Sequence, residues 1–459
     1  MVRRSSPPGP LAPSPRLPTT AGSRWQIGPL DPAAGVNLAG RILTVGSRGL
    51  LLLLSARHLG LEEFGELSLI LATLTVGVAV VGLELYAVTG RRIPGRPLAE
   101  AAAVIGGQCR VHLLAYLAAG PLLWGLFRLK LLPGGYFAFV YAALVLEHWS
   151  METFRWLLAL ERHVEANLVV SLKGAVVVGT LVLLDPPYGL KALLTMVLIS
   201  QAAASVAGAW FLRGWFRSAL NRRREGAATA VAASPISANV SVNVSVNVSA
   251  VVSAIGPAMW FYVSTLAATL ASYLGQYVLK AGGTSGQVGV LAFFQSLGNT
   301  MPLLVHATVI QAGLPRLCRL ANTSSAGLAA ERECFERRIR GACLLLYPAL
   351  ILASHAAALW SRKAEMLSYW VIYPVATAAA LNVLWLIPNY RLYLGGRYRA
   401  QCLSSLAGCG ASLALNVWWA PAYGAAGAAL ATLGSAAVLA ASGWWQARRV
   451  ERASSVCCC

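Results

Sequence analysis

A few ionisable side chains lie inside long uncharged stretches of the sequence, where a charge is costly unless it faces a cavity or a partner. Arg41 and Arg48 are seven residues apart, so in a helix they share a face about 10 Å apart along the axis. His148, Glu152 and Arg155 follow the i, i+4, i+7 spacing and also share a face. Guanidinium groups can bind phosphate oxygens in pairs, whereas carboxylates can couple transport to a cation. The pattern therefore allows an anion site, an ion-coupling site, or both.

Each of these residues also has a purely structural explanation. Arg48 suits a substrate cavity and an internal ion pair, for instance with Glu84, equally well. Arg41 is near the start of its apolar stretch, which favours a side chain that reaches back to the membrane surface. Arg155 can simply pair with Glu152. Two further charges, Glu84 and Lys173, are weaker candidates of the same kind.

The amino-acid composition indicates what class of protein holds these side chains. Of the 459 residues, 57% are hydrophobic and only 12% are charged, with a mean hydropathy of +0.62. A soluble protein carries about 25% charged residues. Uncharged runs such as 67–83 and 366–390 are long enough to cross a bilayer as helices. The sequence predicts an all-α, multi-pass membrane protein and excludes a soluble enzyme, a secreted disulfide scaffold and a fibrous protein.

Apolar runs that end at charged residues, proline or glycine predict twelve transmembrane helices. The 48-residue run 400–447 must contain two of them, because Pro421 and Gly424 interrupt it and one span needs only about 20 residues. The expected spans are 36–57, 65–89, 110–127, 136–160, 164–184, 190–212, 252–279, 287–315, 341–361, 366–390, 400–419 and 424–446.

The basic residues predict an orientation for these spans. Lys and Arg together number 37, against 17 Asp and Glu, which gives a net charge of +20. With the N-terminus inside, the inner segments carry 26 of the basic residues and the outer loops only seven. Inner loops of membrane proteins are enriched in Lys and Arg. We therefore expect a protein of the inner cell membrane with both termini cytoplasmic, and no nucleic-acid partner.

The remaining segments divide the chain. A disordered, proline-rich cytoplasmic tail is expected at 1–35, a six-helix half at 36–213, a low-complexity cytoplasmic linker at 214–251, a second six-helix half at 252–446 and a short cytoplasmic tail at 447–459. The two halves start alike, with Phe64-Gly65 in one and Val288-Gly289 in the other. Equal halves with an even number of helices predict a pseudo-twofold axis along the membrane normal. The nine cysteines show no zinc-site spacing, and three of them end the chain as Cys457–Cys459.

Two segments resemble a known family. The segment 55–69 (SARHLGLEEFGELSL) resembles the first loop of the Wzx-type oligosaccharide flippases of polysaccharide biosynthesis. The segment 415–432 (LNVWWAPAYGAAGAALAT) resembles the turn between their eleventh and twelfth helices. These flippases belong to the multidrug/oligosaccharidyl-lipid/polysaccharide (MOP) exporter superfamily.

The resemblance implies a flippase that is not an enzyme and needs no cofactor. It would move a polyprenyl-pyrophosphate-linked oligosaccharide across the membrane by alternating access, for a surface polysaccharide such as O-antigen. Its partners would be this substrate, membrane lipids and other polysaccharide-assembly proteins. The candidates for a cationic substrate cavity are Arg48, Arg41, Arg155 and Lys173, and those for ion coupling or pairing are Glu84, Glu152 and His148. We expect no catalytic residues and no metal site.

Three rival functions differ in what the sequence must contain. A cation-coupled multidrug exporter of the MATE type needs acidic coupling residues, for which Glu84, Glu147 and Glu152 are conceivable, but the arginines of the first span argue against a cationic drug. A polysaccharide polymerase or ligase needs a large outer loop, and the longest expected here is about ten residues. A lipid II flippase usually has two further helices, for which 447–459 leave no room. The sequence contains no Gly-rich nucleotide-binding motif, which argues against direct use of ATP.

Cysteine labelling tests the predicted orientation. In a cysteine-free background, Gly134→Cys should react with a membrane-impermeant thiol reagent in intact cells. Ser237→Cys should react only after the membrane is permeabilised, because Ser237 lies in the predicted cytoplasmic linker. Labelling of Ser237→Cys in intact cells would overturn the orientation.

Overall fold

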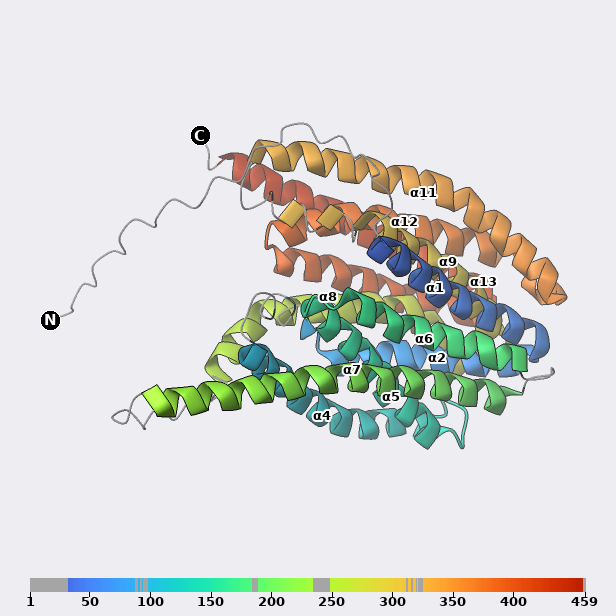
Figure 1. The fold of residues 1–459 in the computed structure, drawn as a ribbon. Coiled ribbons are helices and arrows are strands. Elements are labelled where there is room, and N and C mark those ends of the chain that lie inside the picture. Colours follow the sequence, from blue (N-terminus) through green and yellow to red (C-terminus); the bar gives the residue numbers. More distant parts are fainter. Residues whose placement is uncertain are drawn as a thin grey trace.

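The computed structural model describes residues 32–86, 90, 93, 98–183, 189–233, 248–310, 313–314, 317–318, 320 and 325–456. Within these residues all regular structure is helical, and the long helices run roughly side by side (Figure 1). Eight of them are long and apolar enough to cross a membrane. The predicted class, an all-α multi-pass membrane protein, is therefore confirmed.

The predicted spans fall on long helices. The last predicted pair lies in a single continuous element that breaks at Gly424, where φ is 57° and ψ is −136°, so the run 400–447 does form two helices. The elements are α1 (Pro32–His58), α2 (Leu61–Gly82), α4 (Leu98–Arg128), α5 (Phe137–Ala159), α6 (His163–Leu183), α7 (Leu190–Ala233), α8 (Val248–Ala281), α9 (Ser285–Val305), α11 (Ser325–Ser361), α12 (Tyr369–Leu394) and α13 (Tyr398–Val456), with the short turns η1 (His306–Ile310) and η2 (Ala364–Met366).

Several helix ends differ from the prediction. Helices α4 and α11 begin well before their apolar runs, and α7 continues to Ala233, inside the predicted linker. An apolar run marks only the part of a helix that suits lipid, and Ala, Arg and Glu favour helix beyond it. Helix α2 ends earlier than predicted, at Gly82, because Leu83 and Glu84 take left-handed conformations. Residues 1–31, 234–247 and 457–459, which hold most of the tail, the repeat and the cysteine triplet, lie outside the described residues.

The helices pack closely where small residues meet. In the first half of the chain α1 lies on α6, and a Cβ on Gly174 of α6 would come within 3.0 Å of the Leu43 carbonyl oxygen of α1. In the second half α13 packs on α8 and α12. Helices in lipid gain no hydrophobic energy from associating, so close backbone approach through small residues provides much of the attraction. Between the halves, the most extensive contact joins α2 to α9, followed by α2 to α8.

Helices α2 and α9 meet at their first turns, backbone against backbone. A Cβ on Gly65 would lie 2.0 Å from the carbonyl oxygen of Ser285, and one on Gly289 would lie 2.7 Å from that of Leu61. Real Cβ atoms do not come this close, so both positions require glycine. These are the two glycines that open corresponding helices of the two halves in the sequence. Beside them, Phe64 and Phe293 pack edge to face with ring centroids 6.2 Å apart.

We call the end of the molecule that holds this crossing the predicted outer end. Three further contacts join the halves there. The guanidinium of Arg57 lies 4.7 Å from the ring centroid of Trp360, and the ammonium of Lys280 lies 3.7 Å from a Glu66 carboxylate oxygen. The Lys363 ammonium donates a hydrogen bond to the Leu59 carbonyl. The halves are therefore held together at this end in the conformation observed.

Replacing one of the crossing glycines should separate α2 from α9. We expect Gly65→Ala to lower the melting temperature of the purified protein, because the added methyl group meets a carbonyl of the facing backbone. Gly125→Ala is the matched control: Gly125 lies inside α4 with open space around it, and alanine there should leave stability unchanged or raise it by about 0.5–1 kcal/mol. If both variants melt alike, the crossing does not constrain the fold.

Candidate functional site

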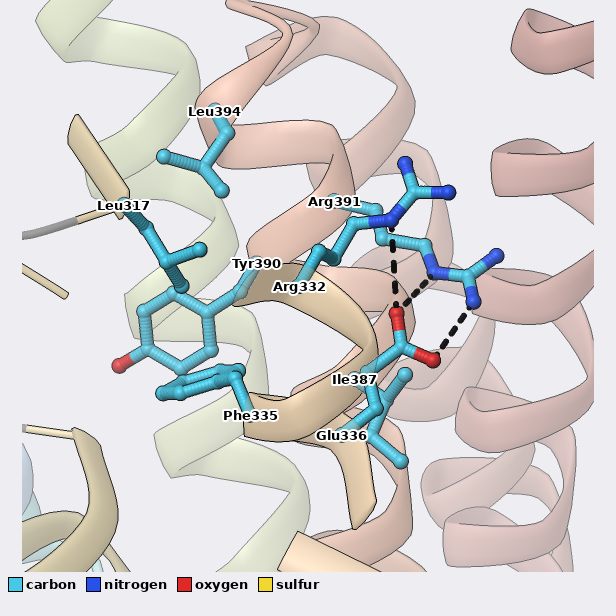
Figure 2. Close-up of a pocket in the computed structure, with 8 residues that line it drawn as sticks. All are labelled: Leu317, Arg332, Phe335, Glu336, Ile387, Tyr390, Arg391 and Leu394. Carbon is cyan, nitrogen blue, oxygen red and sulfur yellow. Dashed lines mark hydrogen bonds and ion pairs between the residues drawn. The ribbon is translucent and has the colours of Figure 1, made fainter. Parts of the chain in front are cut away.

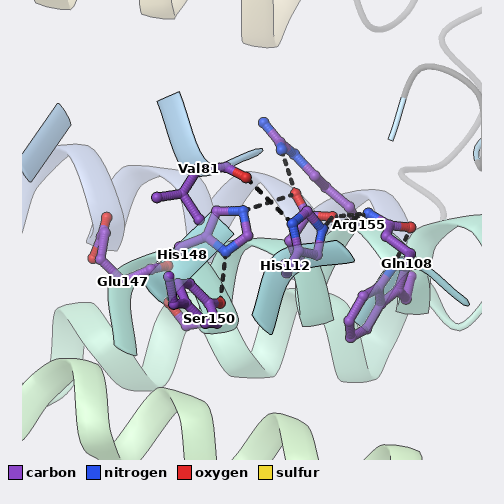
Figure 3. A network of polar contacts seen from close by, with 10 residues as sticks. Val81, Gln108, His112, Glu147, His148, Ser150 and Arg155 are labelled. Atoms are coloured by element: carbon purple, nitrogen blue, oxygen red, sulfur yellow. Dashed lines mark hydrogen bonds and ion pairs between the residues drawn. The ribbon is translucent and has the colours of Figure 1, made fainter. Parts of the chain in front are cut away.

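A buried polar network joins α4 to α5 behind the last turn of α2 (Figure 3). Glu152 of α5 is at its centre and is only 1% exposed. Its Oε1 accepts a hydrogen bond of 2.6 Å from Arg155, and its Oε2 accepts one of 2.5 Å from the side-chain amide of Gln108. Both oxygens of the carboxylate thus have a donor, an arrangement that stabilises its negative charge.

The orientation of Gln108 fixes the state of His112. The indole Nε1 of Trp156 donates to Gln108 Oε1 at 2.9 Å, so the amide nitrogen of Gln108 points the other way, toward Glu152 and His112 Nε2. That nitrogen lies 3.0 Å from His112 Nε2. An amide nitrogen only donates, so Nε2 must accept, and the proton sits on Nδ1, which lies 3.3 Å from the Val81 carbonyl oxygen.

His148 is the least satisfied member of the network. Its side chain is fully buried, and its Nδ1 lies 2.7 Å from the Tyr116 hydroxyl. Its Nε2 has no hydrogen-bond partner and lies 3.9 Å from Glu152 Oε1. The His112 and His148 rings meet edge to face with centroids 4.5 Å apart. A Cβ on Gly82 would come within 3.4 Å of His148 Nε2, so the backbone of α2 closes this side of the network.

Arg155 links the network to the residues after α2. Its side chain is 24% exposed, and its guanidinium lies 3.9 Å from the ring centroid of Tyr86. It also interacts with the carboxylate of Glu84, which the Tyr86 hydroxyl contacts through a hydrogen bond. Glu84 is 7% exposed, and its Oε2 has no hydrogen-bond partner. The structure thus brings together four of the seven candidates from the sequence: His148, Glu152, Arg155 and Glu84.

The other three candidates lie elsewhere. Lys173 of α6 forms an ion pair with Glu147 of α5, which neutralises its charge. Arg41 and Arg48 are on α1, and their side chains lie outside the part of the chain that the structure describes. Their neighbours Gly40 and Ser47 face α6.

Sequence reasoning missed the α4 side of the network. Gln108, His112 and Tyr116 repeat every four residues, a spacing that places them on one helix face. The predicted span began at 110, so Gln108 fell outside it, and His112 was one polar residue in an apolar run. The repeat is the signal that could have found them, but it becomes convincing only once α5 supplies the facing carboxylate.

A second polar cluster ties together three helices of the second half, and Figure 2 shows its residues on α11 and α12. Arg391 of α12 donates two hydrogen bonds of 2.7 Å to the two carboxylate oxygens of Glu336 on α11. It also reaches Glu451 of α13 at 3.1 Å, and Arg332 lies 3.6 Å from the same carboxylate. A forked arginine on a 5% exposed carboxylate is a strong structural tie. The pocket beside it is small and otherwise lined by Leu317, Phe335, Ile387, Tyr390 and Leu394.

Comparison with known proteins identifies the fold. Neither a protein-family model nor a curated protein matches the sequence. Among solved structures, a multidrug-resistance transporter of the MATE family, in the MOP superfamily and in an inward-facing conformation, matches with a TM-score of 0.57 and 14% identity over 92% of this chain and 98% of its own. The lipid II flippase MurJ in an inward-closed conformation matches with a TM-score of 0.58 and 11% identity over 90% of this chain and 86% of its own. The chain therefore has the fold of the MOP-superfamily transporters.

Removing the central carboxylate should destabilise the first half. Glu152→Ala leaves the buried Gln108 amide and Arg155 without their acceptor, and breaking a buried ion pair costs about 3–5 kcal/mol. We expect a clear drop in the melting temperature of the purified protein. The control is Glu333→Ala, which removes an ion pair to Arg337 whose carboxylate is 71% exposed and should cost less than about 1 kcal/mol. Equal effects would show that the network is not a structural unit.

Proposed function

We propose that this protein is a flippase for a polyprenyl-pyrophosphate-linked oligosaccharide and that it works by alternating access. The observation that carries the proposal is the place where the two flippase-like segments of the sequence meet. Gly65 of the first segment contacts the first turn of α9 at Ser285. In the second segment, the Ala425 amide donates to Gln287 Oε1 of the same turn at 2.9 Å. The first segment thus contacts α9 across the boundary between the halves, and the second contacts the same turn of α9 from within its own half, both at the predicted outer end.

At this junction α13 bends at a glycine that also fits closely against α9. Gly424 has a left-handed φ of 57°, and a Cβ there would come within 2.9 Å of Gln287 Oε1. The segment 415–432 therefore needs its glycine both for the bend in α13 and for the fit against α9. Because the outer ends of the halves are in contact, we infer that the structure represents a conformation closed to the outside. Rocking of the halves would open that end and release the substrate.

The substrate class follows from charge. A pyrophosphate headgroup needs cations in a cavity, and its sugars need water or polar groups. Of the four cationic candidates from the sequence, Lys173 is paired with Glu147 and Arg155 with Glu152, which favours the two α1 arginines for contact with the pyrophosphate. Arg48, seven residues further into the span than Arg41, is our candidate for contact with the headgroup.

Transport by the purified protein tests the proposal. Proteoliposomes that contain the full chain should translocate a fluorescent polyprenyl-pyrophosphate oligosaccharide, measured by protection of the label from a membrane-impermeant reductant. Empty vesicles and the same oligosaccharide without its lipid are the controls. Accumulation of a cationic dye in a proton or sodium gradient, with no translocation of the lipid-linked sugar, would instead favour a multidrug exporter.

Substitutions at Arg48 test the headgroup contact. We expect Arg48→Glu to abolish translocation while membrane insertion stays normal, because the reversed charge repels the pyrophosphate. Arg48→Lys should retain part of the activity, since the charge remains but the paired hydrogen bonds of the guanidinium are lost. Arg41→Glu is the matched control on the same helix and should have the smaller effect. If Arg48 is only a structural partner of Glu84, the exchange Arg48→Glu with Glu84→Arg should restore transport.

A further inference from the structure

Three buried side chains converge on one point between α4 and α5. One nitrogen each from His112 and His148 and one carboxylate oxygen of Glu152 all lie within 4.8 Å of one another. Each of the three side chains is at most 1% exposed. Two imidazoles and a carboxylate are a ligand set that first-row transition metals prefer, and Zn²⁺ in particular.

The hydrogen bonds around the three residues determine which ring nitrogens can bind a cation. The Val81 carbonyl takes the proton on His112 Nδ1, and the Gln108 amide requires that His112 Nε2 accept. His148 Nε2 has no hydrogen-bond partner and lies 3.9 Å from Glu152 Oε1. If the proton of His148 is on Nδ1, donated to the Tyr116 hydroxyl, Nε2 presents a bare lone pair. In that tautomer His148 Nε2 and Glu152 Oε1 face each other 3.9 Å apart with no hydrogen between them, and a cation bound there removes their repulsion.

The charges nearby also favour a cation. Among the described residues, the carboxylates of Glu152 and Glu84 both interact with the guanidinium of Arg155. When both carboxylates are ionised and both histidines are neutral, these described side chains carry one net negative charge inside the predicted spans. The neighbouring ion pair of Lys173 and Glu147 is balanced within itself and adds none. An unbalanced charge at this depth costs several kcal/mol unless a counter-ion or a proton compensates it.

We propose that His112, His148 and Glu152 form a binding site for a divalent transition-metal ion, with Zn²⁺ the best fit. His112 Nε2 lies 3.6 Å from Glu152 Oε2, His148 Nε2 lies 3.9 Å from Oε1, and one ligand atom from each residue lies within 4.8 Å of the other two. Ligands of a tetrahedral Zn²⁺ ion, bonded at about 2.0–2.1 Å, lie about 3.3 Å apart, so the side chains must close in by up to about 1.5 Å when the ion binds. The ion would replace the Gln108 N–H at His112, while Gln108 keeps its bond to Glu152.

The residues behind the ligands match those that support metal-bound histidines elsewhere. Such histidines usually donate their other N–H to a carbonyl, a carboxylate or water. Here the Val81 carbonyl holds His112, and the Tyr116 hydroxyl holds His148. With three protein ligands, a fourth position remains for water. The sequence alone gave no such site, because His112 is on a different helix from His148 and Glu152. The ion would fasten α4 to α5, and this inference does not depend on which substrate the protein carries.

Metal binding by the purified full-length protein tests the site directly. The protein is prepared in detergent with a tag that contains no histidine, and Cys457, Cys458 and Cys459 are replaced by serine because thiolates bind zinc. Zn²⁺ affinity is measured by competition with a chromophoric chelator, and Co²⁺ serves as a spectroscopic probe. We expect one Zn²⁺ per chain and a tetrahedral Co²⁺ spectrum without the charge-transfer band of a thiolate.

Three variants locate the ion. His148→Gln and His112→Gln should each weaken Zn²⁺ binding by about tenfold or more, because each removes a ligand. His355→Gln is the control, since His355 is a histidine of α11 that bonds within its own helix. Substoichiometric binding by the unmodified site, a thiolate band, or equal affinity in all variants would overturn the proposal. The first result would leave protons as the compensating charge. The first two outcomes need no folded variant, so instability of the histidine variants cannot hide the answer.

Discussion

The arrangement of the two halves depends on the contact of two helix backbones at Gly65 and Gly289. In lipid, apolar side chains gain nothing by leaving solvent for a neighbouring helix, so helices must touch closely to attract each other. At this crossing no side chain separates the backbones, and each glycine lies against the facing helix. Next to the glycines, the Phe64 and Phe293 rings pack edge to face across the same contact. Moving either glycine by one position along its helix would place a side chain in the contact and force the helices apart.

Away from that crossing, the structure is governed by the need to partner every polar group that enters the membrane. Lys173 and Glu147 pair across α5 and α6, and Glu152 is satisfied from two sides. Small hydroxyl side chains also find partners on neighbouring helices. Ser412 of α13, for example, donates a hydrogen bond of 2.9 Å to the Ala271 carbonyl of α8. Where a buried group stays without a partner, as at His148 Nε2, the unpaired atom marks a place where a ligand would be stabilised.

The sequence was informative wherever a single helix carries the signal. Runs of apolar residues located the helices, Pro421 and Gly424 located the break in α13, and the i, i+4, i+7 spacing placed His148, Glu152 and Arg155 on one face. It was not informative where the answer depends on a second helix. Nothing in the sequence says that α4 turns Gln108 and His112 toward Glu152, or that α2 ends early and brings Glu84 beside Arg155. The extensions of α4, α7 and α11 past their predicted spans were also missed. Hydropathy shows which part of a helix suits lipid, but it does not show where the helix ends.

Buried ion pairs hold the helices together inside each half, whereas other kinds of contact join the two halves. This difference matters for the proposed rocking of the halves. Inside the halves, buried and forked hydrogen bonds such as Glu152 with Arg155 and Glu336 with Arg391 are directional and expensive to break. Between the halves, the contacts include glycine backbones, aromatic edges, the partly exposed Lys280–Glu66 pair, which contributes at most about 1 kcal/mol, and single hydrogen bonds such as the one between the Thr73 and Tyr277 hydroxyls. Each of these contacts is weaker than a forked, buried ion pair inside a half. If the halves rock as proposed, they would separate along the surface that lacks such ion pairs among the described residues.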